Sequence, residues 1–417
     1  MSQSQQIAPT SMQERVVELD AIRGFAILGI LLVNMSAFSA PMYQYGAEQA
    51  FTGLDAFVHQ VLEAIVRAKF YTMFSFLFGL GMVFFLERAE KKGIRAVPLF
   101  RRRLLMLLGF GLVHAYLIWS GDILTEYALL GFVLVLFYRA KPRKLLLFAA
   151  VSWLLPLLFT FTPIYFWVRT IYIKLHFTQG LYPHMLYTEG MQAYGSGSYW
   201  DMVVQRFHEL LMMYGGYYGS MPTLLTMFLL GVWAGKKRIF HNLGQHVKFL
   251  RIVLVVGLVV GGGLTLFEVF GPQPMTDSQN FWFRMFWYRL ADPALCFFYI
   301  ATLALLLQNR VWQTRLAPLA FVGRMAISNY LLCSVICTTI FYNYGFGLFT
   351  KVGPAKGLLM TLLIYTLLMV FSVFWLSKYR FGPVEWLWRT LTYGKRQPMR
   401  IQPRTDGKKE PASNVAG

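Results

Sequence analysis

The chain has 417 residues, of which 57% are hydrophobic, 17% are aromatic and only 14% are charged. Charged residues make up about a quarter of an ordinary soluble domain, so this composition excludes that class and indicates an integral membrane protein. The net charge of +20 could suggest nucleic acid, but the Lys and Arg residues stand in short groups between apolar runs, as in membrane-protein loops. We therefore expect a lipid bilayer as partner and no nucleic acid.

The three cysteines, Cys296, Cys333 and Cys337, all lie in apolar segments, which argues against an extracellular disulfide framework. Cys333 and Cys337 would share a helical face, but no other ligand types stand near them in the sequence. Small buried cysteines are therefore the favoured interpretation. We expect no metal site and no covalently bound cofactor.

Taken in chain order, the apolar runs predict an all-α polytopic membrane protein with about ten spans. Residues 1–14 are polar and are expected to be a disordered tail. The run 22–40 is longer than the apolar part of a signal peptide and is expected to stay as an anchor. Residues 51–68 are amphipathic and predict a helix at the membrane interface. The other predicted spans are 69–86, 104–119, 123–138, 144–167, 223–235, 252–270, 286–307, 321–342 and 357–376.

We expect a single transmembrane helical domain over residues 15–393, followed by a basic disordered tail, 394–417. Its longest polar connection, 169–220, is rich in Tyr and Gly and is expected to be an outer loop. Ten spans place both termini on one side, and the connections and tails on that side hold 30 of the 39 Lys and Arg residues. Because basic connections stay in the cytoplasm, we expect both termini to be cytoplasmic.

One histidine and two carboxylates stand within and between two apolar runs: His114, Asp122 and Glu126. The intervening Ser-Gly-Asp is short enough only for a tight reversal, so either carboxylate can approach His114. Ionisable side chains in a membrane are costly and favour a functional role. An imidazole can remove a proton from a hydroxyl or amine, and a carboxylate can fix its tautomer. The alternative is a histidine that bonds helices together; we favour catalysis.

Charged residues near the cytoplasmic ends of two spans leave two interpretations open. Asp20 stands where a helix N-cap belongs, and Arg23 can pair with it one turn later. These two residues form either a structural cap and anchor or an electropositive entrance for a phosphate-bearing donor. Arg324 either anchors its span or adds to that phosphate site, and Asn329 either joins helices or contacts substrate.

Two further groups of residues favour a structural role over a functional one. Arg289 and Asp292 stand one turn apart and predict an ion pair within one helix, with substrate contact as the alternative. The segment 381–389 contains Pro383 at its first turn, Glu385 and two tryptophans, which predicts an interfacial helix with an anchoring role.

Five blocks of the sequence, taken together and in their order along the chain, resemble the bacterial membrane family known as domain of unknown function 418, the YeiB-like proteins. The blocks are 19–34, 69–81, 101–131, 323–332 and 381–389. That family is similar to polytopic acyltransferases, including the acyltransferase-three and heparan-alpha-glucosaminide acetyltransferase-like proteins, whose first span opens with an LDxxRG-like motif. The resemblance implies transfer of an acyl group from a cytoplasmic donor, often acetyl-CoA, to a sugar or envelope acceptor.

One position departs from that pattern. In the acyltransferase-three group the first span typically closes with a histidine, whereas Asn34 stands at the comparable end here. A catalytic histidine must then lie elsewhere, and His114 is the candidate.

The leading hypothesis is an O- or N-acyltransferase in which Arg23 and Arg324 bind the donor's phosphates. His114 would act as general base or transient acyl carrier, Asp122 would orient it, and Asn34 would help to bind the acceptor or a carbonyl oxygen.

The rival is a transporter or proton-coupled exporter whose path is lined by His114, Glu126, Arg289 and Asp292. A noncatalytic scaffold is a third, weaker alternative. The acceptor, the acyl chain and the oligomeric state, including a homo-oligomer, are left open.

Overall fold

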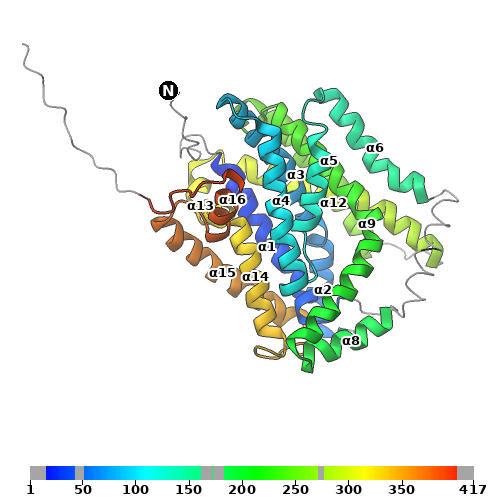
Figure 1. Ribbon diagram of the computed structural model, residues 1–417. Coiled ribbons are helices and arrows are strands. Elements are labelled where there is room, and N and C mark those ends of the chain that lie inside the picture. Colours follow the sequence, from blue (N-terminus) through cyan, green and yellow to red (C-terminus); the bar gives the residue numbers. More distant parts are fainter. Residues whose placement is uncertain (1–15, 43–50, 161–170, 172–182, 271–276, 402–417) are drawn as a thin grey trace, which may run out of the picture.

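The structure, a computed structural model, describes residues 16–42, 51–160, 171, 183–270 and 277–401 (Figure 1). Within these residues it is helical and has no β-sheet, only an isolated bridge between Tyr379 and Arg400. The expected all-α fold is therefore confirmed. The helices are α1 (Val17–Ser39), α2 (Gly53–Ile65), α3 (Lys69–Lys91), α4 (Ala96–Val113), η2 (His114–Ile118), α5 (Leu124–Val135), α6 (Pro142–Thr160), α8 (Pro183–Ser196), α9 (Tyr199–Lys236), η3 (Leu243–His246), α10 (Val247–Val256), η4 (Gly257–Gly262), α11 (Gly263–Phe270), α12 (Asp277–Leu306), α13 (Arg310–Arg324), α14 (Ala326–Phe341), α15 (Pro354–Lys378) and α16 (Pro383–Tyr393).

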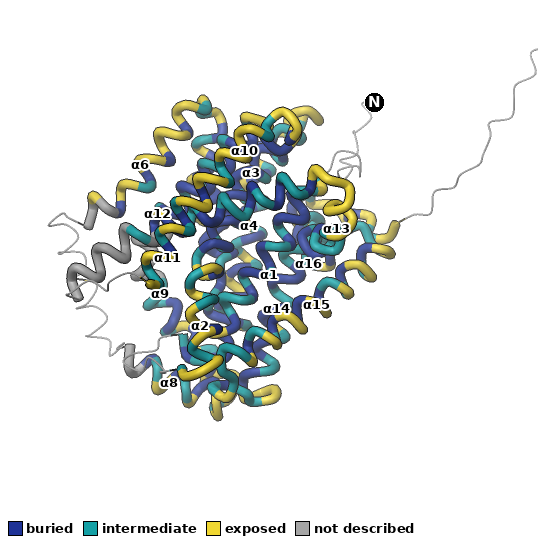
Figure 2. The backbone as a smooth tube through the Cα atoms, turned by 180° about the vertical axis from the view of Figure 1, so that it is seen from behind, coloured by how far each residue is buried: buried dark blue, intermediate teal, exposed yellow. Residues whose placement is uncertain are grey.

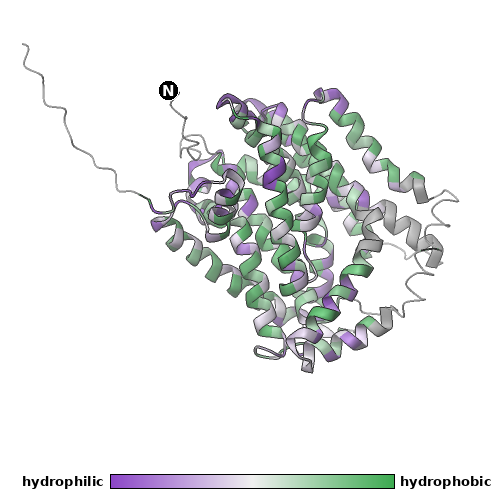
Figure 3. Ribbon diagram, viewed as in Figure 1, coloured by the Kyte–Doolittle hydropathy of each residue, from purple (hydrophilic) through white to green (hydrophobic). Residues whose placement is uncertain are grey.

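Apolar residues run along most of the helices (Figure 3). By length and composition, five helical segments of the described chain can cross a membrane, or six if the bent pair α13 and α14 counts as one span. The five are Val17–Ser39, Gly53–Lys91, Leu243–Phe270, Arg289–Leu306 and Pro354–Lys378. Two shorter apolar helices, Leu124–Val135 and Met221–Lys236, accompany them. Transmembrane helices are thus supported, whereas the count of ten stays a prediction.

Helix α1 lies at the centre of the bundle and packs against α3, α13, α14 and α15 (Figures 1 and 2). Its inward residues Ile22, Ala26 and Leu31 are almost fully buried. Helices at the periphery of the bundle expose apolar side chains instead of burying them; on α15, Leu359 and Leu363 are examples. An apolar exterior around a buried core is what a hydrocarbon environment permits.

Two glycines allow α1 and α13 to approach closely. A Cβ atom on Gly24 would lie 2.0 Å from the carbonyl oxygen of Leu319, and one on Gly323 would lie 1.8 Å from that of Asp20. Small residues at crossing points allow membrane helices to bring their backbones together. The contact places the N-terminal end of α1 beside Arg324.

The span predicted over 321–342 is interrupted near its start, because the chain bends by 78° between α13 and α14. Glu385 of α16 reaches the start of α14. There its carboxylate accepts the backbone N–H groups of Ile327 at 2.7 Å and Ser328 at 3.0 Å, and the Ser328 hydroxyl at 2.5 Å. The first N–H groups of a helix need such partners. Glu385 therefore supports a second helix start, in keeping with the structural role expected for it.

The outer loop expected over 169–220 is largely helical where the structure describes it. Helix α8 covers Pro183–Ser196, and α9 extends through the predicted 223–235 span from Tyr199. A capping box between Ser198 and Asp201 starts α9. The predicted tail 1–14, the end of the 144–167 span and the tail beyond residue 401 lie outside the described residues.

Candidate functional site

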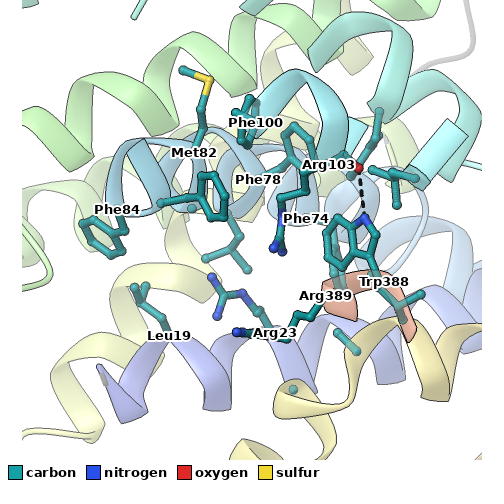
Figure 4. Close-up of a pocket in the computed structure, with 18 of the residues that line it drawn as sticks. Leu19, Arg23, Phe74, Phe78, Met82, Phe84, Phe100, Arg103, Trp388 and Arg389 are labelled. Carbon is teal, nitrogen blue, oxygen red and sulfur yellow. Dashed lines mark hydrogen bonds between the residues drawn. The ribbon is translucent and has the colours of Figure 1, made fainter. Parts of the chain in front are cut away.

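A cavity of about 340 Å³ lies at the end of the bundle where α1 begins and α16 ends. Cations from five parts of the fold line it: Arg23, Arg88, Lys92, Arg103, Arg324 and Arg389. Among the described lining residues the one acidic side chain is Asp20. We call this space the basic cavity. Figure 4 shows Arg23, Arg103 and Arg389 turning their side chains toward it from three different helices.

Local contacts fix two of these arginines. Arg23 pairs with Asp20 at 2.8 Å, as predicted, although Asp20 lies inside the first turn rather than at the N-cap because α1 begins at Val17. The Arg103 guanidinium stacks 3.6 Å from the ring of Trp388, whose Nε1 donates to the Arg103 carbonyl oxygen at 2.9 Å (Figure 4). Stacked guanidinium groups keep their planar donors available for phosphate or carboxylate.

The basic cavity continues from its cationic residues into an apolar, aromatic region. Phe74 and Phe78 of α3 contribute to its walls, together with Ile123, Tyr127 and Tyr330. The Tyr127 hydroxyl donates to the Tyr71 carbonyl oxygen at 2.8 Å. The cavity therefore offers donors for anionic groups in one part and an apolar lining for a chain in another. Its volume falls in the range of small-molecule sites.

His114 lies at the centre of a buried chain of hydrogen bonds. Its Nδ1 is 2.8 Å from Asp122 Oδ1, and its Nε2 is 2.9 Å from Ser334 Oγ. Because the carboxylate accepts a hydrogen bond, the ring proton belongs on Nδ1, and Nε2 accepts from the Ser334 hydroxyl. The hairpin thus joins His114 to Asp122, as the sequence allowed. Ser334 was not predicted, since it lies 220 residues away on α14.

This Asp122–His114–Ser334 cluster lies just beyond the apolar region of the basic cavity. Tyr330, which lines the cavity, precedes Ser334 by one turn of α14, and its ring centroid is 5.1 Å from that of His114. Ile123, another lining residue, directly follows Asp122. His114 itself is fully buried and is not among the lining residues. Tyr330 therefore separates the cavity from the cluster.

The local backbone holds His114 and Asp122 together. Helix α4 gives way to a π-helical turn, His114–Ile118, a feature that often marks functional positions. One turn before His114, Gly111 leaves room for the reversal, since a Cβ there would lie 3.0 Å from Asp122 Oδ2 and 2.6 Å from the Thr125 nitrogen. Thr125 N–H donates to Asp122 Oδ2 at 2.7 Å. The second carboxylate oxygen is thereby fixed as well.

A second polar cluster lies on the other side of the reversal. Ser120 donates a hydrogen bond to the buried carboxylate of Glu209, which also accepts from Tyr194 at 2.8 Å and Gln205 at 3.2 Å. The buried Arg206 donates to the Leu117 carbonyl oxygen at 2.9 Å. These contacts connect α9 to the His114 segment.

Other predicted site residues lie elsewhere. Glu126 is buried in the first turn of α5, but both ring nitrogens of His114 are occupied by other groups. Asn34 is half-buried on α1 and is not among the lining residues of the basic cavity. Asn329 donates to the Val322 carbonyl oxygen at 3.0 Å and to Ser372 at 2.9 Å, which connects α14 with α13 and α15.

Asp292 pairs with Lys69 of α3 at 2.8 Å, not with Arg289 as expected. Arg289 donates to Thr223 at 3.3 Å and lines a second cavity of about 650 Å³ between α6, α9, α10 and α12. That cavity is almost wholly apolar. The structure therefore brings Arg23 and Arg324 together in one site and Arg289 and Asp292 near another.

Comparison with known proteins identifies relatives of the chain. Residues 234–395 match the family described as protein of unknown function DUF418. The chain is 41% identical to the uncharacterised YxaH of Bacillus subtilis (strain 168), over 94% of this chain and 98% of the relative. It is 32% identical to the uncharacterised YeiB of Escherichia coli (strain K12), over 91% and 96%. An uncharacterised Bacillus acidopullulyticus protein is 29% identical over 95% and 99%.

Proposed function

We propose that this chain, which belongs to the YeiB-like DUF418 family, is a membrane acyltransferase. It moves an acyl group from a phosphate-bearing thioester of the acyl-CoA type, such as acetyl-CoA, to a hydroxyl or amine of a sugar or other envelope acceptor. Donor and acceptor are small-molecule substrates, and no covalently bound cofactor is invoked.

The observation that carries the proposal is the place of the His114–Asp122 pair, directly beyond the apolar region of a cavity rich in arginine. Converging guanidinium groups favour phosphates through charge-assisted hydrogen bonds. Acyl transfer to a hydroxyl needs a proton acceptor near the reacting carbonyl. A donor whose phosphates bind the arginines would extend its acyl end along the aromatic walls toward Tyr330.

In this mechanism Arg23 and Arg324 bind the donor's phosphates, joined by Arg103 and Arg389, neither of which was predicted from the sequence. His114 Nε2 accepts a proton, and Asp122 holds Nδ1–H and stabilises the imidazolium that forms. Asn34 stays a proposed acceptor ligand, which rests on the family resemblance.

A transporter or exporter is the second candidate. The buried ion pair between Lys69 and Asp292, near the cavity lined by Arg289, is the observation that favours it. Ionisable groups of this kind can line a path and titrate during turnover. The two functions differ in whether a covalent bond to the acyl group is broken.

The discriminating experiment uses the full-length protein in detergent and in sealed vesicles. Purified protein is incubated with labelled acetyl-CoA, and donor binding, release of free CoA and labelled product are measured. We expect binding and CoA release, with weaker binding in Arg324→Gln. Flux of a substrate across sealed vesicles without CoA release would favour the transporter.

The proposal includes ten spans, cytoplasmic termini and a bacterial inner-membrane location. Val16, Lys92 and Tyr393 all line the basic cavity, so both ends of the described chain and the first basic connection lie at one end of the bundle. This arrangement supports a common, basic side. On that side the donor would bind from the cytoplasm.

A further inference from the structure

We infer that Ser334 is a transient acyl carrier, which accepts the acyl group from the donor and passes it to the acceptor. The inference rests on the proposed acyl-transfer function and deepens it, because one direct transfer becomes two successive transfers. It assigns the covalent role to a side chain that the sequence did not point to.

The hydrogen bonds around His114 have the order of an activated nucleophile. Ser334 Oγ lies 2.9 Å from Nε2, and Asp122 Oδ1 lies 2.8 Å from Nδ1. A hydroxyl is a weak nucleophile until an adjacent base takes its proton, and a carboxylate on the base's other nitrogen holds the tautomer that can do so. Each member is at least 96% buried, so water does not compete for these bonds.

Packing alone does not explain where the Ser334 hydroxyl points. Hydroxyls inside helices usually bond to a carbonyl of the preceding turn. On the same helix, Thr338 and Thr339 do this, donating to the Val335 carbonyl oxygen at 3.2 and 2.7 Å. Ser334 is 3.4 Å from the corresponding Tyr330 carbonyl oxygen but 2.9 Å from His114. Its closer partner is the imidazole.

The basic cavity leads to Ser334 along one face of α14. Ile327 and Tyr330 line the cavity, and Ser334 follows Tyr330 on the same face. The Tyr330 ring lies between the cavity and Ser334. Two long contacts hold its hydroxyl, to the Gly121 carbonyl oxygen and the Ile123 nitrogen, each 3.3 Å. An acyl group reaches Ser334 when this ring turns aside.

Bonds and protons are conserved in each of the two acyl transfers. As Ser334 Oγ bonds to the thioester carbonyl carbon, its proton passes to His114 Nε2; the C–S bond then breaks, and the leaving thiolate takes that proton. In the second step the acceptor's hydroxyl or amine gives its proton to Nε2 and bonds to the acyl carbon. The ester bond to Ser334 breaks, and Oγ recovers the proton. No atom is oxidised or reduced.

The test compares wild type with Ser334→Ala, Ser334→Cys and the control Thr338→Val, which also removes a buried α14 hydroxyl. Each full-length protein is incubated with labelled acetyl-CoA without acceptor, quenched in acid, and analysed for covalent label by peptide mass spectrometry. Acyl transfer to acceptor and CoA binding are measured in parallel. Monodisperse elution and retained CoA binding verify that each variant is folded.

We expect label on Ser334 in the wild type and in Thr338→Val, and none in Ser334→Ala. Transfer by Ser334→Ala should fall by at least ~10²-fold with CoA binding unchanged. Label on Ser334→Cys should become labile to neutral hydroxylamine, because it is a thioester.

Full transfer by Ser334→Ala overturns the inference, as does label on His114. Loss of transfer without label on any residue also overturns it and leaves Ser334 as a positioning residue. In each case the acyltransferase proposal survives. Wild-type protein that binds CoA without any acyl transfer overturns the proposed function itself.

Discussion

His114 has no spare hydrogen-bonding capacity, because Asp122 and Ser334 occupy its two ring nitrogens in a site closed to solvent. Removing any member leaves a buried polar group without its partner, which costs about 1–3 kcal/mol. Variants at this cluster therefore lose stability as well as chemistry. Kinetic measurements need a folding check for each variant.

For His114→Ala we expect acyl transfer to fall by ~10²–10⁴-fold, because the proton acceptor is gone. The donor's KM should change little, since His114 does not line the basic cavity. The measurement is labelled acetyl transfer with purified protein. His208→Ala is the matched control, since His208 is partly exposed on α9 beside Glu189. Transfer at the wild-type rate by His114→Ala would remove the mechanism.

Asp122→Asn keeps the size of the side chain and changes its charge. We expect kcat to fall by ~10²-fold or more, with a smaller change in KM, because the amide no longer stabilises the imidazolium. The pH–rate profile should also shift, which a merely structural role would not produce. An unchanged profile with a proportionate loss of folded protein would contradict this expectation.

At the scale of elements, the basic cavity depends on where helices touch. Arg23 on α1 and Arg324 on α13 meet because Gly24 and Gly323 let the two helices approach. The bend after α13 then directs α14 past the cavity toward His114, and α16 supports that bend through Glu385.

Gly24→Ala tests the close approach. Its Cβ would meet the backbone of Leu319, which cannot give way as a side chain can, so we expect a loss of about 1–3 kcal/mol and weaker CoA binding. Thermal melting in detergent and CoA binding are the measurements. Gly109→Ala on α4 is the control, because nothing lies within 4 Å of its Cβ. Equal effects of the two substitutions would contradict the packing argument.

Glu385 should make stability depend on pH. Burial raises the pKa of its carboxyl above the ordinary value of 4.5, although its bonds to Ser328 and the α14 backbone act in the opposite direction. Such a carboxyl contributes its full stabilisation at pH values below its pKa in the unfolded chain. The contribution is lost as pH rises through its higher pKa in the folded protein.

We therefore expect the melting temperature of the wild type to fall more steeply than that of Glu385→Gln as pH rises above the ordinary carboxyl value of 4.5. Melting curves in detergent at several pH values give the two slopes. Glu63→Gln serves as control, since Glu63 lies at the exposed surface and pairs with Arg67. Parallel slopes for wild type and Glu385→Gln would show that this carboxyl does not contribute.

At the scale of the whole molecule, hydropathy and charge predicted the class of fold, while contacts between distant segments decided the site. The reversal at 120–122 joined His114 to Asp122 and was visible in the sequence because both residues belong to one hairpin. Ser334 was not visible, since only the packing of α14 brings it there. The α13–α14 bend was missed because its supporting carboxylate comes from the later helix α16.

In one region the amino-acid composition led to a wrong prediction of secondary structure. Tyr and Gly suggested a loop over 169–220, yet apolar packing and a capping box give helices from residue 183 onward. Similarly, charge spacing within α12 suggested a local ion pair, whereas Asp292 pairs with Lys69 of α3. Interhelical partners cannot be assigned from the spacing along one helix.

The proposed topology predicts the side of each connection. A fluorescent protein fused to the C-terminus should be bright and alkaline phosphatase fused there inactive, because the basic ends of the bundle stay in the cytoplasm. Insertion of alkaline phosphatase at residues 343–347, between α14 and α15, should give active enzyme. An active C-terminal phosphatase fusion would reverse the orientation.

The 220 residues between His114 and Ser334 also bear on how the protein is made. A ribosome that has released α1 to α5 into the bilayer has placed a histidine, an aspartate and several arginines there before α14 and α16 exist to meet them. Until these helices emerge, His114 lacks the Ser334 hydroxyl and Arg103 lacks the Trp388 ring, in a solvent that penalises unpaired polar groups. A nascent chain stalled before α14 should therefore be a target for membrane proteases, whereas one that ends after α16 should persist.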